Sequence, residues 1–300
     1  MTTVSSTRSE GLVSGAPARG IAARLIGRFG SAGTKIALIL VALFWLVPVL
    51  GLLVASLRPE SDNSASGWWT VFTEPAKLTL SNYGELLKNP VIVKSFGNTL
   101  LITVPATVLV VVISALAAYA LAWIEFPGRD WLTIGVVGLL VMPIQVALIP
   151  ISKLYGFLGI FGSTAGVILF HVAFGLPFAV FLLRNFFSAI PQDLLEAARM
   201  DGAGELSTFR RVVLPISLPA IASLAIFQFL WVWNDLLVAL IFADPESAPI
   251  TVELQTQLRQ FGSNVDLLAT GSFVSMIIPL VVFFGFQRFF VQGVLAGSTK

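Results

Sequence analysis

The side chains of this sequence that are best suited to chemistry gather in one polar stretch, residues 191–219, between two long apolar runs. Carboxylates and guanidinium groups form charge-assisted hydrogen bonds, within one chain or with a partner protein. Enzymatic acid–base or metal chemistry is not favoured, because the chain has one histidine and no cysteine. The charged residues of the stretch are Asp193, Glu196, Arg199, Asp201, Glu205, Arg210 and Arg211.

The first half of the stretch has the pattern of a short helix. Pro191 suits a first turn, Asp193 lies near the positive end of the helix dipole, and Arg199 lies near its negative end. Gly202 is then expected to end the helix in a left-handed backbone conformation. A second turn is predicted beyond it, capped by Ser207 or Thr208 and ended by Pro215 and Pro219.

The centre of this helix suits contact with another protein. Ala197 and Ala198 carry little side chain and allow a close approach, while Glu196 offers a carboxylate to an arginine of the partner. An amphipathic connector that lies on the lipid surface is the alternative interpretation.

The composition places the rest of the chain in a lipid bilayer. Of the 300 residues, 56% are hydrophobic and 11% are charged, against about 25% charged in soluble proteins. The absence of cysteine excludes disulfides, one histidine argues against a histidine metal site, and a net charge of +2 does not indicate nucleic acid as a partner. Residues 27–35 are not a phosphate loop, since their lysine follows Thr34 rather than a glycine. If the protein depends on ATP, another chain must therefore bind it.

Six stretches are long enough to cross about 30 Å of hydrocarbon as helices. The sequence therefore predicts an all-α integral membrane protein, in which prolines inside the helices cause kinks. The predicted spans are residues 36–57, 99–123, 131–151, 164–183, 218–242 and 269–290.

The basic residues predict the orientation. With the N-terminus in the cytoplasm, twelve of the 18 lysines and arginines lie on the inner side, together with the C-terminus and the polar stretch. We divide the chain into a disordered, basic cytoplasmic tail (1–34), a first transmembrane helix with an outer segment (35–94), and the main transmembrane domain (95–300). In the outer segment Trp68 and Trp69 suit the membrane interface or an external partner.

A few polar residues inside the spans are candidates for a translocation path. Asp235 and Asn234 could hydrogen-bond to the hydroxyl groups of a solute, with Trp231 and Trp233 beside them as stacking surfaces. The alternative for Asp235 is a pairing within the helix bundle, and the two interpretations stay open.

His171 and Gln145 are two further candidates for the path. His171 lines a cavity in this interpretation, or else it bonds to a backbone carbonyl inside the bundle, which we favour. Gln145 lines the path or bridges to an adjacent helix, with the bridge favoured.

The spacing within the polar stretch resembles a known motif. Glu196-Ala197-Ala198, three residues, Gly202, nine residues, Val212, one residue and Leu214-Pro215 are similar to the EAA loop of bacterial ATP-binding-cassette (ABC) importer permeases, with valine in place of isoleucine. The resemblance implies that residues 190–215 form a cytoplasmic coupling helix that docks in a groove of an ATPase subunit. The coupling residues that it implies are Glu196, Ala197, Ala198, Asp201, Gly202, Leu214 and Pro215.

A wider resemblance covers residues 95–300 and narrows the family to carbohydrate permeases of the maltose type. It implies a type I importer permease fold and a non-enzymatic subunit without cofactors, in the bacterial cell membrane. It also implies a di- or oligosaccharide substrate and, as partners, a second non-identical permease, a dimeric ATPase that binds ATP and Mg, and an extracellular solute-binding protein. The matching segments are SFGNTL (95–100), AAYALAWIEFPGRDWL (117–132), MPIQVALIP (142–150), GLPFAVFLLRNFFSAIP (175–191), WND (233–235) and QRFFVQGVLAGSTK (287–300).

Two other function classes compete with this interpretation. A secondary active transporter would need a coupling-ion site near the middle of the membrane, where Asp235 is the one carboxylate that comes close. A membrane enzyme would need a cluster of reactive groups within a span, and the spans have none. An ATP-driven importer subunit is therefore the leading hypothesis.

Overall fold

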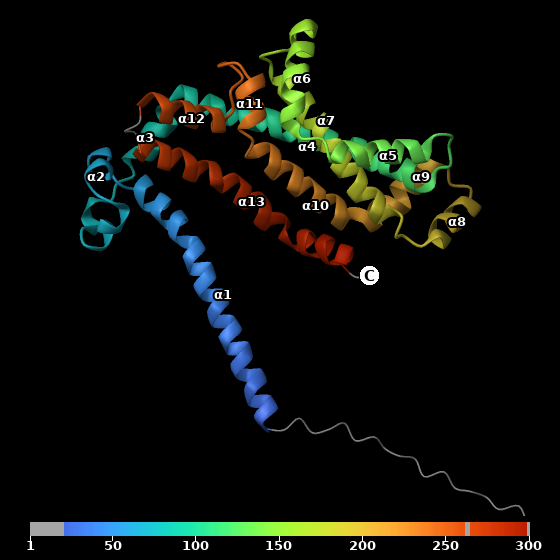
Figure 1. The fold of residues 1–300 in the computed structure, drawn as a ribbon, viewed down its shortest axis with the longest axis horizontal. Helices are drawn as coiled ribbons and strands as arrows, with labels where there is room; N and C mark the ends of the chain where they lie inside the picture. The colour runs from blue at the N-terminus through green and yellow to red at the C-terminus, as the bar shows by residue number, and fades with distance from the viewer. Residues whose placement is uncertain (1–20, 262–264, 299–300) are drawn as a thin grey trace, which may run out of the picture. The chain divides into compact units, whose positions relative to one another are not determined.

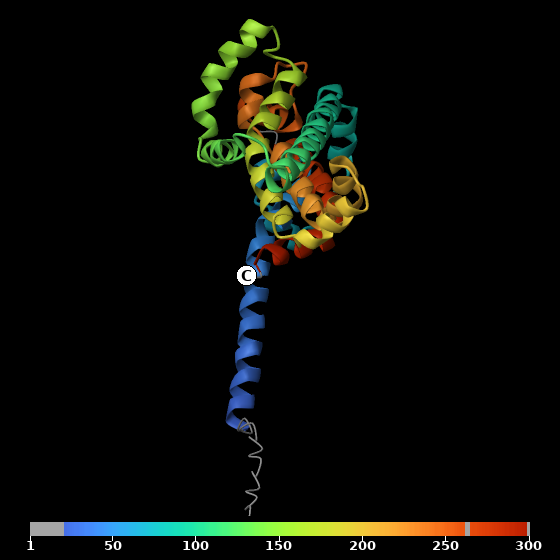
Figure 2. The ribbon, with the colours of Figure 1, turned by 90° about the vertical axis from the view of Figure 1, so that its right-hand side faces the viewer.

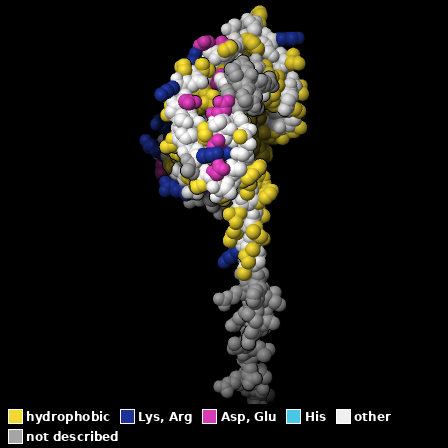
Figure 3. Space-filling model, turned by 90° about the vertical axis from the view of Figure 1, so that its left-hand side faces the viewer, with side chains coloured by type: hydrophobic (Ala, Val, Ile, Leu, Met, Phe, Trp, Pro, Cys, Tyr) yellow, Lys and Arg dark blue, Asp and Glu magenta, His cyan; other side chains and the backbone are white. Residues whose placement is uncertain are grey.

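The computed structural model describes residues 21–261 and 265–298, and the chain divides between Gly51 and Leu52 into two units. The first unit holds most of the 36-residue helix α1 (Ile21–Ser56). Its apolar part, Ala32–Ser56, is long enough to span a membrane, and its hydrophobic side chains are exposed along its length (Figure 3). The predicted tail lies outside the described residues up to residue 20, and from Ile21 the backbone is already helical.

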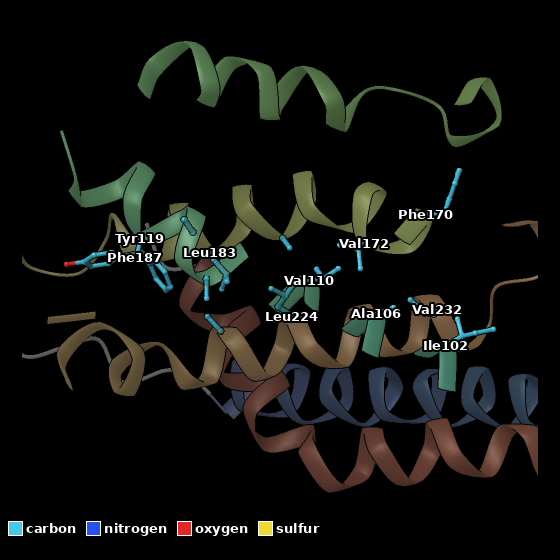
Figure 4. Packing of buried hydrophobic residues seen from close by; sticks show 14 of the residues in the cluster. Ile102, Ala106, Val110, Tyr119, Phe170, Val172, Leu183, Phe187, Leu224 and Val232 are labelled. Carbon is cyan, nitrogen blue, oxygen red and sulfur yellow. The ribbon is translucent and has the colours of Figure 1, made fainter. Parts of the chain in front are cut away.

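The second unit is built on four long helices: α4 (Pro90–Trp123), α7 (Thr164–Phe187), α10 (Leu214–Trp233) and α13 (Val265–Ser298). Helix α4 packs against α7 and α10, and α10 also packs against α7 and α13. Small and branched side chains from the first three helices interdigitate in the core (Figure 4), because small residues allow transmembrane helices to approach closely. Among them are Ile102, Ala106, Val110, Val172, Leu183, Leu224 and Val232.

One end of this unit carries several short helical elements (Figure 1). These are α2 (Glu60–Ala65), the 3₁₀ turns η1 (Trp68–Phe72) and η2 (Pro75–Lys77), α3 (Ser81–Lys88) and α12 (Ile250–Phe261). Lysine, arginine and acidic side chains mix on this end (Figure 3), as expected for a surface outside the hydrocarbon. The opposite end of the unit carries α8 (Gln192–Met200) and α9 (Glu205–Thr208) (Figure 1).

The predicted third span, 131–151, is broken in the structure. Helix α5 (Arg129–Leu140) and helix α6 (Ile144–Leu158) meet at 104° across residues 141–143. Pro143 supplies the extended backbone before α6, and its ring fixes φ near −64°. Helix α5 packs on α7, whereas α6 projects away from the packed helices and contacts α11 (Leu237–Phe242) (Figures 1 and 2). The described residues thus contain five helices able to span a membrane, or six when the bent pair counts as one span.

The predicted fifth span, 218–242, is also wrong at both ends. The helical path starts at Glu205 with α9, passes through a π-helical turn, η3 (Phe209–Val213), and continues as α10 to Trp233. Pro215 and Pro219 do not end it: Pro215 lies in the first turn of α10, directly after the π-helical turn, and Pro219 lies inside α10. Ser207 and Thr208 do not cap it either; Gly204 occupies the N-cap position of α9.

Candidate functional site

The polar stretch forms the short helix that its pattern predicts. Helix α8 runs from Gln192 to Met200, with Asp193 in its first turn and Arg199 in its last. Leu195 is fully buried and anchors the helix to the core, while the Gln192 amide donates a 2.7 Å hydrogen bond to Glu196 Oε1 on the outer face. The helix therefore has one face fixed to the membrane domain and one face free.

The end of α8 is a left-handed glycine turn. Gly202 has a φ of 78°, its N–H donates to the Arg199 carbonyl at 3.0 Å, and the Ala203 N–H donates to the Ala198 carbonyl at 3.0 Å. These two bonds form a Schellman motif, which satisfies carbonyls that the helix end leaves open. A Cβ atom at Gly202 meets nothing within 4 Å, so the backbone angle and any partner protein constrain this position, and the chain's own side chains do not.

A hydrogen-bonded cluster, Arg199–Glu205–Tyr119, ties this turn to the membrane domain. The Tyr119 hydroxyl donates to Glu205 Oε2 at 2.6 Å, and Arg199 Nε donates to Glu205 Oε1 at 3.1 Å. Arg199 also donates to the Trp123 carbonyl at 3.3 Å, at the end of α4. Its hydrogen bond to Glu205 raises the pKa of the Arg199 guanidinium, which therefore stays charged.

The free surface of the polar stretch combines small, acidic and apolar residues. Glu196, Ala197, Asp201, Gly202 and Pro215 are exposed, whereas Ala198 is half-buried and Leu214 packs on the core. Beside them Leu194, Met200 and Leu206 expose 45%, 88% and 62% of their surface. An exposed apolar surface of this kind, next to a carboxylate, suits a protein partner.

The second candidate region is the break between α10 and α11, where Asp235 caps a helix. Its carboxylate accepts hydrogen bonds from the Val238 N–H at 3.3 Å and the Ala239 N–H at 3.0 Å, in the first turn of α11. Its backbone carbonyl accepts from the Thr251 hydroxyl at 2.6 Å. The expectation that Asp235 lies deep within a continuous span is therefore wrong, because the chain turns at this residue.

His171 of α7 completes this region. It is 1% exposed, its Nε2 lies 3.6 Å from Asp235 Oδ2, and its ring meets the Trp231 ring edge-on at 5.2 Å. Its Nδ1 has no hydrogen-bond partner among the described residues, so the favoured bond to a backbone carbonyl is absent there. The structure thus brings His171, Trp231 and Asp235 together.

The other path candidates lie apart from this group. Trp233 is buried, and its indole N–H donates to the Ser275 carbonyl at 3.1 Å, which fixes α10 to α13. Asn234 is exposed; it donates to the Leu230 carbonyl at 2.8 Å and lines a cavity of ≈ 660 Å³ between α10, α12 and α13. Gln145 is exposed in the first turn of α6. No group of three or more histidine, cysteine or acidic residues in the described chain could hold a metal ion.

Comparison with known protein families decides the assignment of the chain. The profile of the family described as "Binding-protein-dependent transport system inner membrane component" matches residues 92–296. The chain belongs to this family. It is therefore a multi-pass membrane protein, a component of a transport system, with the all-α fold predicted from its sequence.

Individual permeases support the same assignment. The osmoprotective compounds uptake permease protein GgtD of Synechocystis sp. is 50% identical over 270 residues, covering 88% of this chain and 91% of GgtD. The alpha-glucoside transport system permease protein AglG of Rhizobium meliloti is 46% identical over 255 residues, covering 83% and 67%. A solved bacterial ABC transporter that imports alginate has the same fold, with a TM-score of 0.76 at 22% identity, covering 92% of this chain and 100% of the solved one.

The sequence pattern does not reveal every positioning residue of this permease. Tyr119 lies within an apolar run, and its link to Glu205 spans 86 positions, so that no local spacing indicates it. Glu205 stands six residues after Arg199 across a turn, which is a weak signal without the structure. Met200 and Leu206 could have been found as apolar residues inside a charged stretch.

Proposed function

We propose that the chain is the permease subunit of an ATP-driven importer for carbohydrates, with a di- or oligosaccharide as substrate. The observation that carries the proposal is the exposed helix α8, which ends in a left-handed glycine turn and is braced to the membrane domain by Arg199, Glu205 and Tyr119. The resemblance to AglG and to the trehalose permease SugB of Mycobacterium tuberculosis, 35% identical over 266 residues covering 87% of this chain and 94% of SugB, supports a sugar as substrate.

In this proposal the polar stretch transmits force between two proteins. The groove of an ATPase subunit receives α8, with Glu196 paired to an arginine of the groove and Ala197, Ala198 and Gly202 allowing the close approach. When ATP and Mg draw the ATPase subunits together, the cluster of Arg199 with Glu205 and Tyr119 passes the movement to α4. The permease itself neither binds ATP nor catalyses a reaction, and it needs no cofactor or metal.

The remaining parts of the proposal concern partners and place. The chain pairs with a second, non-identical permease in the bacterial cell membrane, with both termini and α8 in the cytoplasm. An extracellular solute-binding protein delivers the sugar; a solved alginate transporter in complex with its periplasmic protein, with a TM-score of 0.67, gives a precedent at the level of the fold. The path candidates are Asn234, Asp235, Trp231, Trp233, His171 and Gln145, and nucleic acid is not a partner.

The test is ATP-driven sugar uptake by the reconstituted complex. Vesicles holding both permeases, with the ATPase and the binding protein, are loaded with ATP or a non-hydrolysable analogue, and the entry of labelled maltose and trehalose is measured. Uptake with ATP alone supports the proposal, whereas uptake driven by an ion gradient without ATP supports a secondary transporter. Labelling of Met200→Cys, a position that is 88% exposed, from one side of the membrane determines the side of α8.

A further inference from the structure

An aromatic cleft lies between α7 and α10, next to the residues of the path candidates. It has a volume of ≈ 280 Å³ and is lined by Phe174, Gly175, Phe178, Phe227, Gln228 and Trp231. Phe174 and Phe178 are four residues apart on α7, and Phe227 and Trp231 are four residues apart on α10, so each helix presents two rings one above the other. Four rings from two neighbouring helices thus surround one hollow.

The polar side chain of this cleft is Gln228. It is 4% exposed, and its Nε2 donates to no atom of the described chain. Its amide occupies the space over Gly175, where a Cβ atom would lie 2.8 Å from both Nε2 and Oε1. Gly175 therefore makes room for the amide, and the amide retains an unused hydrogen-bond donor.

We infer that this cleft is a binding subsite for a pyranose ring of the transported sugar. Aromatic rings have apolar faces that suit the C–H faces of a sugar, and a carboxamide donates to or accepts from hydroxyl groups. The four aromatic rings of the cleft suit the C–H faces of a pyranose, and the Gln228 amide suits its hydroxyl groups. The inference rests on the proposed function and names a place in this subunit where the substrate is held.

The position of the cleft agrees with a site on a transport route. Phe174 and Phe178 lie about 15 and 21 Å from the start of α7, at 1.5 Å per residue. A hydrocarbon layer is about 30 Å thick, so these rings lie near its middle. Phe178, Phe227 and Trp231 expose 44%, 42% and 38% of their surface.

The cleft also suits a sugar better than a lipid chain. A hydrocarbon tail fills an apolar hollow but cannot accept a hydrogen bond, so that the buried Gln228 amide would stay unsatisfied at a cost in free energy. A sugar hydroxyl removes this cost. A side chain of the second permease is the remaining competitor, and the experiment separates it from the sugar.

The first arm of the test replaces aromatic rings by smaller aliphatic side chains. Phe178→Leu and Trp231→Leu keep contact with lipid or with a neighbouring helix but lose the ring faces, and Phe181→Leu, on the same helix and outside the cleft, is the matched control. We expect the sugar imported per ATP hydrolysed to fall about 3- to 10-fold for each cleft variant and to stay unchanged for the control. A second pair of variants compares Gly175→Ala with Gly285→Ala. The methyl group of Gly175→Ala displaces the Gln228 amide, whereas that of Gly285→Ala meets open space.

The second arm detects occupancy directly. The assembled complex is labelled with 5-fluorotryptophan and observed by fluorine NMR. The resonance of position 231 is assigned as the one lost in Trp231→Phe, and maltose or trehalose is then added. A saturable shift of that resonance, weakened in Phe178→Leu, is the expected result. Two results would overturn the subsite alone. In the first, the wild type imports sugar, but the resonance does not shift and the cleft variants import sugar normally. In the second, the ring variants fail to assemble, which indicates that the second permease occupies the cleft. Absence of ATP-driven uptake of both sugars by the wild type would overturn the proposed function and the subsite with it.

Discussion

Two polar segments separate apolar helices in this chain, one after α7 and one after α10, and their charged side chains point in opposite directions. After α7 the polar residues of α8 face outward, and hydrogen bonds of Tyr119 and Arg199 attach the end of this stretch to α4. After α10 the carboxylate of Asp235 turns inward to cap α11 and to face His171. Similar side chains in similar sequence surroundings therefore stay exposed in one place and terminate a helix in the other.

The difference follows from what each backbone break leaves unsatisfied. At the end of α8 the glycine turn satisfies the open carbonyls by itself, which frees the side chains Glu196 and Asp201. At the start of α11 two N–H groups need an acceptor within an apolar surrounding, and Asp235 supplies it. Whether a polar side chain points outward or toward the core is thus decided at these two breaks by the backbone next to it.

The largest expected effect comes from changing the outward-facing stretch. We predict that Gly202→Asp and Glu196→Lys each abolish ATP-driven uptake while the protein still inserts, since the apolar spans that direct insertion are unchanged. Reversing the charge at position 196 breaks a pair with the partner arginine, which costs about 2–5 kcal/mol, or roughly 30-fold or more in affinity. Purified complexes are assayed for bound ATPase subunit and for uptake.

The control for this experiment is Gly204→Asp. Gly204 has a φ of −72° and open space for a side chain, and aspartate is favoured at its N-cap position. This variant adds the same carboxylate two residues away without backbone strain and is expected to keep the ATPase bound. Normal assembly and uptake in both Gly202→Asp and Glu196→Lys would contradict the coupling role of α8.

The second prediction concerns the inward-facing carboxylate. Asp235→Ala removes the acceptor of two helix N–H groups and leaves His171 Nε2 without its neighbour, so we expect a loss of about 1–2 kcal/mol in the free energy of unfolding. Thermal unfolding of the purified permease in detergent measures it, with Asn234→Ala, an exposed neighbour, as the control.

A second variant at position 235 tests the path hypothesis. A variant Asp235→Asn keeps one oxygen acceptor for α11 but loses the charge. Full thermal stability of Asp235→Asn with lost uptake would assign the carboxylate to the translocation path, whereas reduced stability with normal uptake per assembled complex assigns it to the bundle alone.

The third prediction tests the brace between the polar stretch and α4. Tyr119→Phe removes the hydroxyl that donates to Glu205 at 2.6 Å, and a hydrogen bond to a charged group contributes about 1.5–3 kcal/mol. We expect faster amide exchange at residues 199–205 and weaker binding of the ATPase subunit. Tyr155→Phe removes a hydroxyl from another buried ring, one that packs on Phe242, and should leave this exchange unchanged. Unaltered exchange in Tyr119→Phe would show that the Tyr119 hydroxyl does not stabilise the turn beyond the hydrogen bonds of Arg199.

The sequence predicts the polar segment at α8 better than the break between α10 and α11. The helix of residues 192–200 and its glycine end follow from local rules of dipole, capping and backbone freedom, so their prediction is confirmed. A kink at Pro143 is expected from the sequence, although its size of 104° is not. The break at residues 234–236 is not predicted, because it is fixed by distant partners such as His171 and Thr251. Assignments of the individual path residues therefore stay predictions.

The smallest expected effect lies just beyond α11, where a second aspartate, Asp244, makes an exposed counterpart to Asp235. Its Oδ1 accepts from the Ser247 hydroxyl and from the Ser247 N–H, each at 2.8 Å, and the hydroxyl bond is the main reason that the pKa of Asp244 is lowered from its ordinary value. A lowered folded pKa means that this turn is stabilised at neutral pH and loses that stabilisation as the pH falls through the folded value. We expect amide exchange at Ser247, normalised for the intrinsic effect of pH, to quicken only in acid, and Ser247→Ala to raise the pH at which it does so. A pH-independent opening of this turn in the wild type would mean that ionisation of Asp244 does not stabilise it.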